Sequence, residues 1–387
     1  MSNDVLTVNM GSSSLKLSLW DGAMAEILRG EVERIGEAPR LTLSCGDGHD
    51  WGKAGAALQP EELLREVFRH LETMRGGAGH LAGVGHRIVH GGHEFSRPTL
   101  VDDAVLQRIA ALSPLAPLHQ PRGIAGIRAC QALRPDLPQV ATFDTTFHRT
   151  VPEATARYAV PPELEAAGLR RYGFHGLSFA HVARRLASEE PGLTRVVVAH
   201  LGNGASLCAL REGRSLDTTM GFTPLDGLVM GTRPGLLDPG TIIWLVREQH
   251  MDVQAIEDLL YHRCGLLGAS GGLASDMRAL EASDDPRAAA AIDLFVHRAV
   301  RELGAMVASL GGLDGIVFTG GIGENSANIR ARIVGRCRWL GAVLDGAANL
   351  RGTPGRISAE ESAITVLVMR ADEEREIAQA ARSVLRS

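Results

Sequence analysis

A pattern of strand, small-residue turn and strand occurs twice in this chain and constrains its fold more than any other feature. The first copy, residues 4–20, has a short apolar run, a turn rich in glycine and serine, and then leucines that alternate with other residues, as in a strand. The second copy, residues 195–210, has the same order around a Gly-Asn-Gly turn. The two copies align when Asn9 is placed on His200, so the pattern indicates an internal duplication.

A third glycine-rich turn lies in residues 314–329, where a predicted strand leads into a helix capped by Ser326. Glycine allows the backbone to approach a ligand closely, and the N–H groups of such turns favour phosphate oxygens. One turn of this kind is weak support for a nucleotide site, because any strand–helix unit contains a turn. Three in one chain, two of them leading into strands, favour nucleotide binding.

The first turn carries polar groups that suit an anion. Ser12 and Ser14 offer hydroxyl donors, and the ammonium group of Lys16 can reach the same anion. Asn9 can hold a water on a hard cation, which prefers oxygen ligands. A Walker-type loop is not expected, because this turn leads into a strand and lacks a Gly-Lys-Ser/Thr tail. The alternative is an ordinary N-terminal hairpin with a serine-rich turn.

Length and composition limit the class of protein. The 387 residues suffice for two domains. A net charge of -5 and an aromatic content of 4% provide neither a basic stripe nor a stacking surface, so nucleic acid is not an expected partner. The five scattered cysteines form no CxxC pair and predict free thiols in a reducing compartment. There is no signal-like N-terminus and no apolar run of membrane-spanning length, so we expect a cytoplasmic protein without a membrane partner.

Two charged side chains follow predicted strands, where ligands are often bound. Arg87 precedes a glycine pair at a strand end and can bind an anion through its planar guanidinium group. Asp144 comes directly after the predicted strand 139–143, at the edge where open α/β sheets bind ligands. The alternatives are a surface ion pair for Arg87 and a helix cap for Asp144.

Several segments are predicted to be irregular, and three of them carry a chemically active side chain. His119 lies in a proline-punctuated loop, which cannot be a helix interior. His175 lies among two arginines, two aromatic residues and two glycines. Arg233 lies near the end of residues 217–235, a loop whose length favours a function. Residues 46–55 are predicted to form a glycine-rich polar loop.

Together these motifs resemble those of the acetate kinase family, within the group that also contains sugar kinases, Hsp70 and actin. The resemblance covers essentially the whole chain. Its segments occur in the order of the family: residues 9–16, 86–92, 116–119, 143–148, 171–176, 200–206, 220–233, 318–326 and 372–374.

The resemblance implies an α/β fold of two duplicated ribonuclease H-like domains, an actin-like ATPase architecture with an active-site cleft between the domains. The N-terminal domain would comprise residues 1–150 plus about 374–387, and the C-terminal, nucleotide-binding domain residues 151–373. The implied reaction is reversible, direct in-line transfer of the γ-phosphoryl group of ATP to acetate, giving acetyl phosphate and ADP. The implied cofactor is Mg²⁺ or Mn²⁺, and the implied assembly is a homodimer.

The same resemblance assigns roles to individual residues. The catalytic residues would be Asp144, His175 and Arg233. Arg87 would bind the substrate carboxylate, and the acyl chain would contact Val89, Leu118, Phe174 and Pro224. The nucleotide-binding residues would be Lys16, His200, Leu201, Gly202, Asn203, Gly204, Asp276, Met277, Arg278, Gly321, Ile322, Gly323, Glu324 and Asn325. Asn9 and Glu373 would be associated with the metal, and Ser12, Ser14 and His119 are further candidates.

The chemistry of the residues agrees with that reaction. A carboxylate is ionised near neutral pH and needs no base, whereas two anions that repel each other need positive charge and alignment. A kinase for propionate or butyrate is the alternative within the family. An actin- or Hsp70-like clamp would not need Arg87, His175 and Arg233, and a sugar kinase would need polar groups for hydroxyls. The chain departs from the family pattern at Gln120, Gly123, Phe179, Pro234 and Leu236, which bears on acyl preference and on support of the site.

Overall fold

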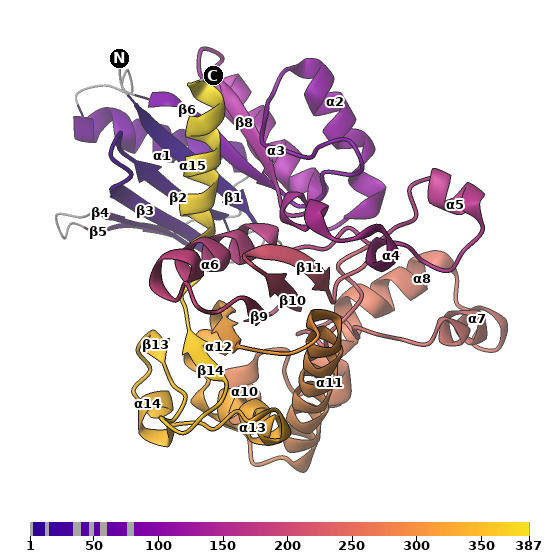
Figure 1. Ribbon diagram of the computed structural model, residues 1–387. Coiled ribbons are helices and arrows are strands. Elements are labelled where there is room, and N and C mark those ends of the chain that lie inside the picture. Colours follow the sequence, from indigo (N-terminus) through magenta and orange to yellow (C-terminus); the bar gives the residue numbers. More distant parts are fainter. Residues whose placement is uncertain are drawn as a thin grey trace. The chain divides into compact units, whose positions relative to one another are not determined.

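The computed structural model of the chain describes residues 3–11, 15–33, 40–45, 50–54, 60–75 and 81–386 (Figure 1). It divides into two compact units, which we call unit 1 (Met1–Thr146 and Asp372–Ser387) and unit 2 (Phe147–Ala371). These unit boundaries, 146/147 and 371/372, lie a few residues before the domain boundaries that we expected, 150/151 and 373/374. Ser12 and Ser14 lie outside the described residues.

Within the described ranges, unit 1 is built on an eight-stranded mixed sheet with the strand order β5-β4-β3-β2-β1-β6-β8-β7. The strands are β1 (Asp4–Met10), β2 (Leu15–Trp20), β3 (Glu26–Glu33), β4 (Arg40–Cys45), β5 (Asp50–Ala54), β6 (Leu81–Ile88), β7 (Thr99–Leu100) and β8 (Gln139–Phe143). The helices are α1 (Pro60–Arg75), α2 (Asp103–Ala111), α3 (Gln120–Leu133) and α15 (Glu373–Leu385).

Alternation along the central strands decides which side chains of unit 1 face which helix. Val8 of β1 packs into the core formed with α1 and α3, whereas Val5 packs against Ala381 of α15. In β6, Gly85 lies against α15, and a Cβ at this position would be 2.8 Å from the side chain of Ile377. Glycine here therefore lets α15 lie close to the sheet, where Figure 1 shows it in yellow.

Among the described residues, unit 2 has a six-stranded sheet with the order β11-β10-β9-β12-β14-β13. The strands are β9 (Arg195–Leu201), β10 (Ala205–Arg211), β11 (Arg214–Thr218), β12 (Gly315–Thr319), β13 (Gly355–Arg356) and β14 (Thr365–Val368). The helices are α4 (Glu153–Ala156), α5 (Pro162–Ala166), α6 (Gly176–Glu189), α7 (Pro239–Arg247), α8 (Val253–Asp258), α9 (Gly265–Ala269), α10 (Met277–Glu281), α11 (Pro286–Leu310), α12 (Gly320–Asn325), α13 (Ala327–Arg336) and α14 (Gly346–Leu350).

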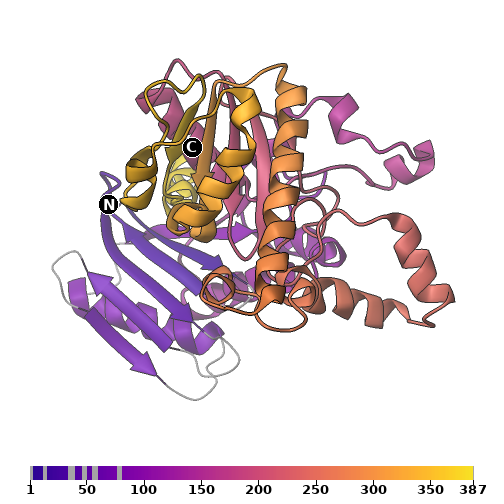
Figure 2. The same ribbon diagram turned by 90° about the horizontal axis from the view of Figure 1, so that it is seen from below.

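The two faces of the unit 2 sheet are covered by different helices. Val198 of β9 and Cys208 of β10 share a core with Phe179 and Val182 of α6. The long helix α11 contacts β9, β10 and β11 and runs beside these strands, in orange in Figure 2. Residues of β9 and β10 that share a face with Val198 therefore point towards α6.

The five central strands of the two sheets have the same order. In unit 1 it is β3-β2-β1-β6-β8, and in unit 2 it is β11-β10-β9-β12-β14. In unit 1, β1 pairs antiparallel with β2 and parallel with β6. In unit 2, β9 pairs in the same way with β10 and β12. This confirms the internal duplication that the repeated pattern predicted and the α/β fold of two ribonuclease H-like halves that the family resemblance implied.

Two local predictions are wrong. Residues 46–55 are not wholly a loop, because β5 lies within them and pairs antiparallel with β4, which satisfies its backbone hydrogen bonds. The glycine-rich turn after β12 is helical, because Gly320 adopts a φ of 78° and lets the strand continue directly into α12. The cap at Ser326 is confirmed: its hydroxyl accepts a hydrogen bond from the N–H of Ile329, at the start of α13.

The chemical state of four cysteines agrees with the prediction of free thiols. Cys130, Cys208, Cys264 and Cys337 form no disulfide, and the side chain of Cys45 lies outside the described part of the chain. The search for membrane spans gives a negative result: within the ranges described, no helix combines the length and the apolar composition that crossing a bilayer requires.

Candidate active site

Four polar side chains of unit 1 gather at the ends of its central strands. Asn9 of β1 and Arg87 of β6 lie on the sheet face that packs against α15, because side chains alternate between the two faces of a strand. Glu373 is the first residue of α15 and so lies on the same side. Asp144 directly follows β8, the strand next to β6. Unit 1 therefore brings together four of the predicted site residues.

Arg87 and Asp144 form an ion pair with several contacts. Nε of Arg87 lies 3.0 Å from Oδ1 and Nη2 lies 2.6 Å from Oδ2 of Asp144. Nη1 lies 3.2 Å from Oδ1 of Asn9 and 3.5 Å from Oε2 of Glu373. Burial acts to lower the pKa of Arg87, but the charges of Asp144 and Glu373 outweigh it and raise this pKa. The guanidinium group is therefore a fixed cation whose Nη1 edge faces Asn9 and Glu373.

Two acidic side chains at the start of α15 share the amide group of Asn9. Its Nδ2 donates to Oε2 of Glu373 and to Oε1 of Glu374, each at 3.1 Å. Burial, followed by the negative charge of Glu373, raises the pKa of Glu374. A cation placed here would relieve this repulsion, and its protein ligands would be carboxylate oxygens, with Asn9 beside them to hold a water of the cation.

These oxygens are the ligands that Mg²⁺ prefers. Among the described residues, no group of three or more histidine, cysteine, aspartate or glutamate side chains forms a candidate metal site. A magnesium ion commonly takes only one or two ligands from protein carboxylates and the rest from water and phosphate. Asn9 and Glu373, with Glu374 beside them, fit a metal held in this way.

The strand–turn–strand pattern of unit 2 is held by backbone hydrogen bonds. The N–H of Gly202 donates to the carbonyl of Gly204 at 3.1 Å, and the N–H of Gly231 donates to the carbonyl of Asn203 at 2.9 Å. A Cβ at position 231 would clash with Oδ1 of Asn203, so any larger residue there would force the Asn203 side chain to move. The long loop is thus fixed to the turn, which places Arg233 beside it.

Arg233 and His175 both approach the turn at Gly204. A Cβ built on Gly204 would lie 2.9 Å from Nη2 of Arg233 and 3.2 Å from Nε2 of His175. Nη1 of Arg233 donates to the carbonyl of Pro224 at 2.7 Å. Burial lowers the pKa of Arg233 to about 10, and in the described part of the chain no acidic side chain forms an ion pair with it. The turn therefore lies beside a positive charge that no carboxylate of the described residues neutralises.

His175 is held in a defined orientation. It precedes α6 with a φ of 57°, an uncommon backbone conformation for a residue other than glycine. Its Nδ1 lies 2.8 Å from Oγ of Ser206, and its ring stacks on that of His200 with a centroid distance of 4.3 Å. Nδ1 of His200 lies 2.9 Å from Oγ of Ser178 in α6. The Nε2 edge of His175 is thereby directed at Gly204.

A pocket of about 330 Å³ adjoins this turn in unit 2. Its lining residues are Gly202, Asn203, Asp276, Met277, Arg278, Glu281, Gly321, Ile322, Asn325 and Ser326. Eight of these were predicted to bind nucleotide, and Glu281 and Ser326 were not. Arg278 has a side chain that is 88% exposed, so it can approach a ligand, whereas Asp276 caps α10.

The remaining predicted nucleotide residues have other positions. Lys16 lies in unit 1, exposed on β2 and directly opposite Asn9. Five residues of unit 2 lie next to the pocket-lining residues in the chain without lining the pocket: His200, Leu201, Gly204, Gly323 and Glu324.

The four residues expected to contact the acyl chain come from different units. Val89 and Leu118 belong to unit 1, and Phe174 and Pro224 belong to unit 2. Val89, Phe174 and Pro224 are buried, and Leu118 is half-buried. Their convergence on one pocket stays a prediction.

Gln120, which follows His119 and departs from the family pattern, makes several hydrogen bonds to the backbone. Gln120 is fully buried at the start of α3. Its Oε1 accepts from the N–H of His90, and its Nε2 donates to the carbonyls of His90 and Ile109. Gln120 therefore fixes the backbone next to Val89, which gives it a structural role beside the expected acyl site.

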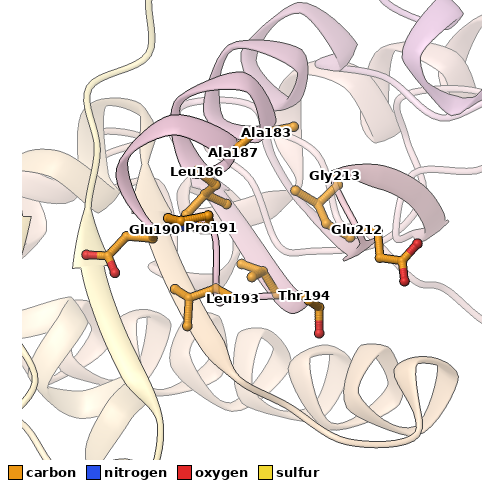
Figure 3. Close-up of a pocket in the computed structure, with 11 residues that line it drawn as sticks. Ala183, Leu186, Ala187, Glu190, Pro191, Leu193, Thr194, Glu212 and Gly213 are labelled. Atoms are coloured by element: carbon orange, nitrogen blue, oxygen red, sulfur yellow. The ribbon is translucent and has the colours of Figure 1, made fainter.

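A larger pocket of about 370 Å³ lies elsewhere in unit 2, between the end of α6 and the start of β9 (Figure 3). Its floor is apolar, with Leu186 and Val196, and Glu190 and Glu212 lie at its rim. It contains no lysine or arginine. Carboxylates without a nearby cation disfavour the phosphates of a nucleotide, so this pocket is not the candidate active site.

The sequence analysis did not single out three residues of the candidate site. They are Glu374 in the unit 1 cluster around Asn9, Ser206 in the unit 2 cluster around His175, and Glu281 in the pocket. The signal for Ser206 was present in the duplication, because it pairs with His200 across the hairpin as Lys16 pairs with Asn9. Glu374 follows Glu373 directly, and only the buried start of α15 distinguishes it from a surface carboxylate. Nothing in the local sequence marked Glu281.

Comparison with known proteins gives consistent results. The model of the acetokinase family matches residues 4–379. A protein of Nitrobacter hamburgensis named acetate kinase is 45% identical over 394 residues, which cover 99% of this chain and 96% of that protein. The crystal structure of a propionate kinase from Francisella tularensis subsp. tularensis SCHU S4 has a TM-score of 0.91 at 37% identity, with 98% of this chain and 99% of that chain covered. The crystal structure of Porphyromonas gingivalis acetate kinase has a TM-score of 0.87 at 36% identity, with 100% of both chains covered.

The crowding at Gly204 gives a direct test of the unit 2 cluster. We expect Gly204→Ala to displace Arg233 or His175, because the added methyl group would lie within 3.2 Å of both. A misplacement of about 1 Å can cost about 10²-fold in turnover, so we expect a loss of up to that size. Steady-state kinetics and the melting temperature should be measured together with Gly335→Ala, where a Cβ has open space. If Gly204→Ala turns over like Gly335→Ala, the turn does not face the reacting group.

Proposed function

The chain belongs to the acetokinase family, and from this premise we propose that it reversibly transfers the γ-phosphoryl group of ATP to acetate, giving acetyl phosphate and ADP. The observation that carries the proposal is the guanidinium group of Arg233, which lies beside a glycine turn near a pocket and forms no ion pair among the described residues. A negative phosphoryl group is the partner that this charge lacks. The cysteine pattern supports a cytoplasmic location for the reaction.

The reaction needs charge and alignment rather than proton transfer. An acetate oxygen forms a bond to the γ-phosphorus atom while the bond from that atom to the bridging oxygen of ADP breaks, and no proton has to move because acetate is already ionised. Asp144 is bound to Arg87 through both carboxylate oxygens, so its proposed role is to orient Arg87. Arg87 would hold the acetate carboxylate through its Nη1 edge.

Arg233 and His175 would act on the transferring group. Charge spreads over the equatorial oxygens of this group in the transition state, and donors that are already in place stabilise it without reorganisation. Ser206 holds Nδ1 of His175, and the Nε2 edge, which is directed at Gly204, would contact the phosphoryl oxygens. The unit 1 and unit 2 clusters would act on one pair of substrates, so we expect them to face a common cleft.

A divalent metal completes the proposed site. Mg²⁺ or Mn²⁺ would be held near Asn9 and Glu373 and would neutralise phosphate charge when bound. Asn9 donates to Glu373 and Glu374 and so keeps both carboxylates turned towards the end of β1. Lys16, opposite Asn9 on β2, would add positive charge on the phosphate side.

The expected acyl preference can be tested by trapping acyl phosphates with hydroxylamine. We expect more hydroxamate from acetate than from propionate or butyrate, and Val89→Ala should shift the ratio towards propionate by about tenfold or more, since one methylene is worth about 1–3 kcal/mol in a matched pocket. Val140→Ala, which trims a buried valine of β8, is the control and should lower stability but keep the ratio.

The outcomes of this assay separate two functions. A preference for propionate by the wild-type enzyme would assign the second candidate, propionate kinase, which the similarity to the Francisella structure supports. Failure to form hydroxamate from any of the three acids would refute the proposed function.

The two arginines should separate kinetically. We expect Arg87→Ala to raise the KM for acetate and to lower kcat, whereas Arg233→Ala should lower kcat with a smaller effect on KM. Arg233→Lys should recover only part of the loss, because an ammonium group cannot replace a planar fork. Arg233→Met should keep or raise the melting temperature, since it removes a buried charge without a carboxylate partner. A variant of Arg233 that is less stable yet turns over normally would make this arginine structural.

A homodimer is the proposed assembly, and an exposed apolar surface of unit 2 supports it. Ile243, Trp244 and Val246 of α7 are 54%, 51% and 47% exposed, and Val253 of α8 is 80% exposed. Apolar surface of this kind marks interfaces. Arg247 and Glu248 follow it directly, and adjacent charges of opposite sign suit a two-fold contact of the surface with itself.

This assembly predicts the effect of a single charge. Light scattering should give a dimer for the wild type and a monomer for Trp244→Glu, because a carboxylate would be buried without a partner at the interface. Trp339→Glu, which changes a tryptophan that is 68% exposed in another part of unit 2, should remain dimeric. A monomeric wild type, or a dimeric Trp244→Glu, would contradict the proposed surface.

A further inference from the structure

The carboxylate of Glu324 is turned away from the nucleotide pocket and joins two backbone segments. Its Oε1 accepts the N–H of Gly320 and the N–H of Ala371, each at 3.0 Å, and the hydroxyl of Thr319 at 3.3 Å. Gly320 begins α12, the helix whose residues Gly321 and Ile322 line the pocket. One oxygen atom thus connects the nucleotide turn to Ala371.

Ala371 is the last residue of unit 2, and the start of α15 follows immediately. Asp372 caps that helix by accepting the N–H of Arg375 at 3.1 Å. Glu373 comes next and accepts the amide of Asn9. Only Asp372 separates Ala371 from Glu373, and one residue spans about 3.3–3.6 Å at most, so a shift of Ala371 leaves little slack before Glu373.

The backbone of α12 is fixed at its other end. Arg330 is 1% exposed, and its Nη1 donates to the carbonyls of Gly323 and Glu324, each at 2.9 Å. Its Nε and Nη2 bind Asn349. These bonds hold the C-terminal end of α12, so a displacement of the helix would be passed to Ala371 through the Glu324 side chain.

We infer that Glu324 is a positioning residue, which couples ligand binding at the nucleotide turn of unit 2 to the placement of Glu373 at the start of α15. The inference rests on the proposed function, because that function supplies the nucleotide and the metal-associated role of Glu373. A direct contact of the carboxylate with phosphate would be repulsive, which also favours the positioning role. Glu324 thereby acts through Ala371 and not on the substrate.

Amide hydrogen exchange at Ala371 reports this coupling without turnover. In the wild type, ADP should slow exchange of the Ala371 N–H. In Glu324→Ala the exchange should be about fivefold faster, as expected for the loss of one hydrogen bond, and should no longer respond to ADP. Glu324→Gln keeps an acceptor oxygen and should restore both the slow exchange and the response.

A kinetic readout accompanies the exchange measurement. Glu324→Ala should raise the Mg²⁺ concentration at half-maximal velocity by about fivefold or more, and Glu324→Gln should not, since only the first loses the tie to the segment before Glu373. Asp314→Ala is the matched control, because Asp314 ties the backbone of Thr194 and Arg195 in unit 2 by similar bonds. It should lower the melting temperature and leave the Ala371 response and the Mg²⁺ dependence unchanged.

The inference is overturned if Ala371 in Glu324→Ala exchanges and responds to ADP as in the wild type, or if Glu324→Gln behaves like Glu324→Ala. Should Glu324→Ala not fold, an ADP-insensitive Ala371 in the wild type overturns it equally. The hydroxamate assay of the wild type tests the proposed function separately: wild-type turnover with an unresponsive Ala371 rejects the coupling alone.

Discussion

The charge of Arg233 is the feature on which the proposed unit 2 site depends. Desolvation lowers the pKa of this guanidinium group to about 10, and among the described residues no carboxylate pairs with it, so the charged form carries a free-energy cost. The backbone around the charge is held in place by two hydrogen bonds. The N–H of Gly231 donates to the turn at Asn203, and Nη1 of Arg233 donates to the carbonyl of Pro224. In the proposed function, an anion that enters beside Gly204 would recover the lost interaction, so the same charge would strengthen binding of a phosphoryl group.

In unit 1, by contrast, the charged side chains of the proposed site are paired with one another. Arg87 is paired with Asp144, and the two carboxylates of α15 share Asn9. Here three carboxylates, those of Asp144, Glu373 and Glu374, face one guanidinium group, and this excess of negative charge suits the proposed metal. The duplicated sheet explains why both clusters lie at the ends of corresponding strands: Asn9 and His200 occupy equivalent positions in β1 and β9, and each points to the helix that covers its face. Gene duplication of one sheet thus yields two sites of complementary charge.

Much of this could be predicted from the sequence, because its signals are periodic or local. The alternation after Asn9, the glycine turn at Gly202 and the same order in both copies predicted the duplication. Separate strand patterns, one ending at a glycine pair and one ending before Asp144, predicted that Arg87 and Asp144 lie at strand ends. Other features depend on packing that no local pattern encodes. The helix α12 follows from the φ of Gly320, the pairing of β5 from an available edge of β4, and the inward turn of Glu324 from the proximity of Ala371, which is far away in the chain. Family resemblance named Glu324 as a residue of the nucleotide segment, and only its hydrogen bonds indicate a positioning role.

The central claim is that Arg87 of unit 1 and Arg233 of unit 2 act in the same transfer, Arg87 on the acetate carboxylate and Arg233 on the phosphoryl group. A double-mutant cycle on kcat/KM for acetate, with Arg87→Lys, Arg233→Lys and the double variant, tests it most directly. If both arginines stabilise the same transition state, their effects are coupled, and the interaction free energy should be about 0.5–3 kcal/mol. Additive effects within about 0.3–0.5 kcal/mol, the range found for independent sites, would contradict the claim.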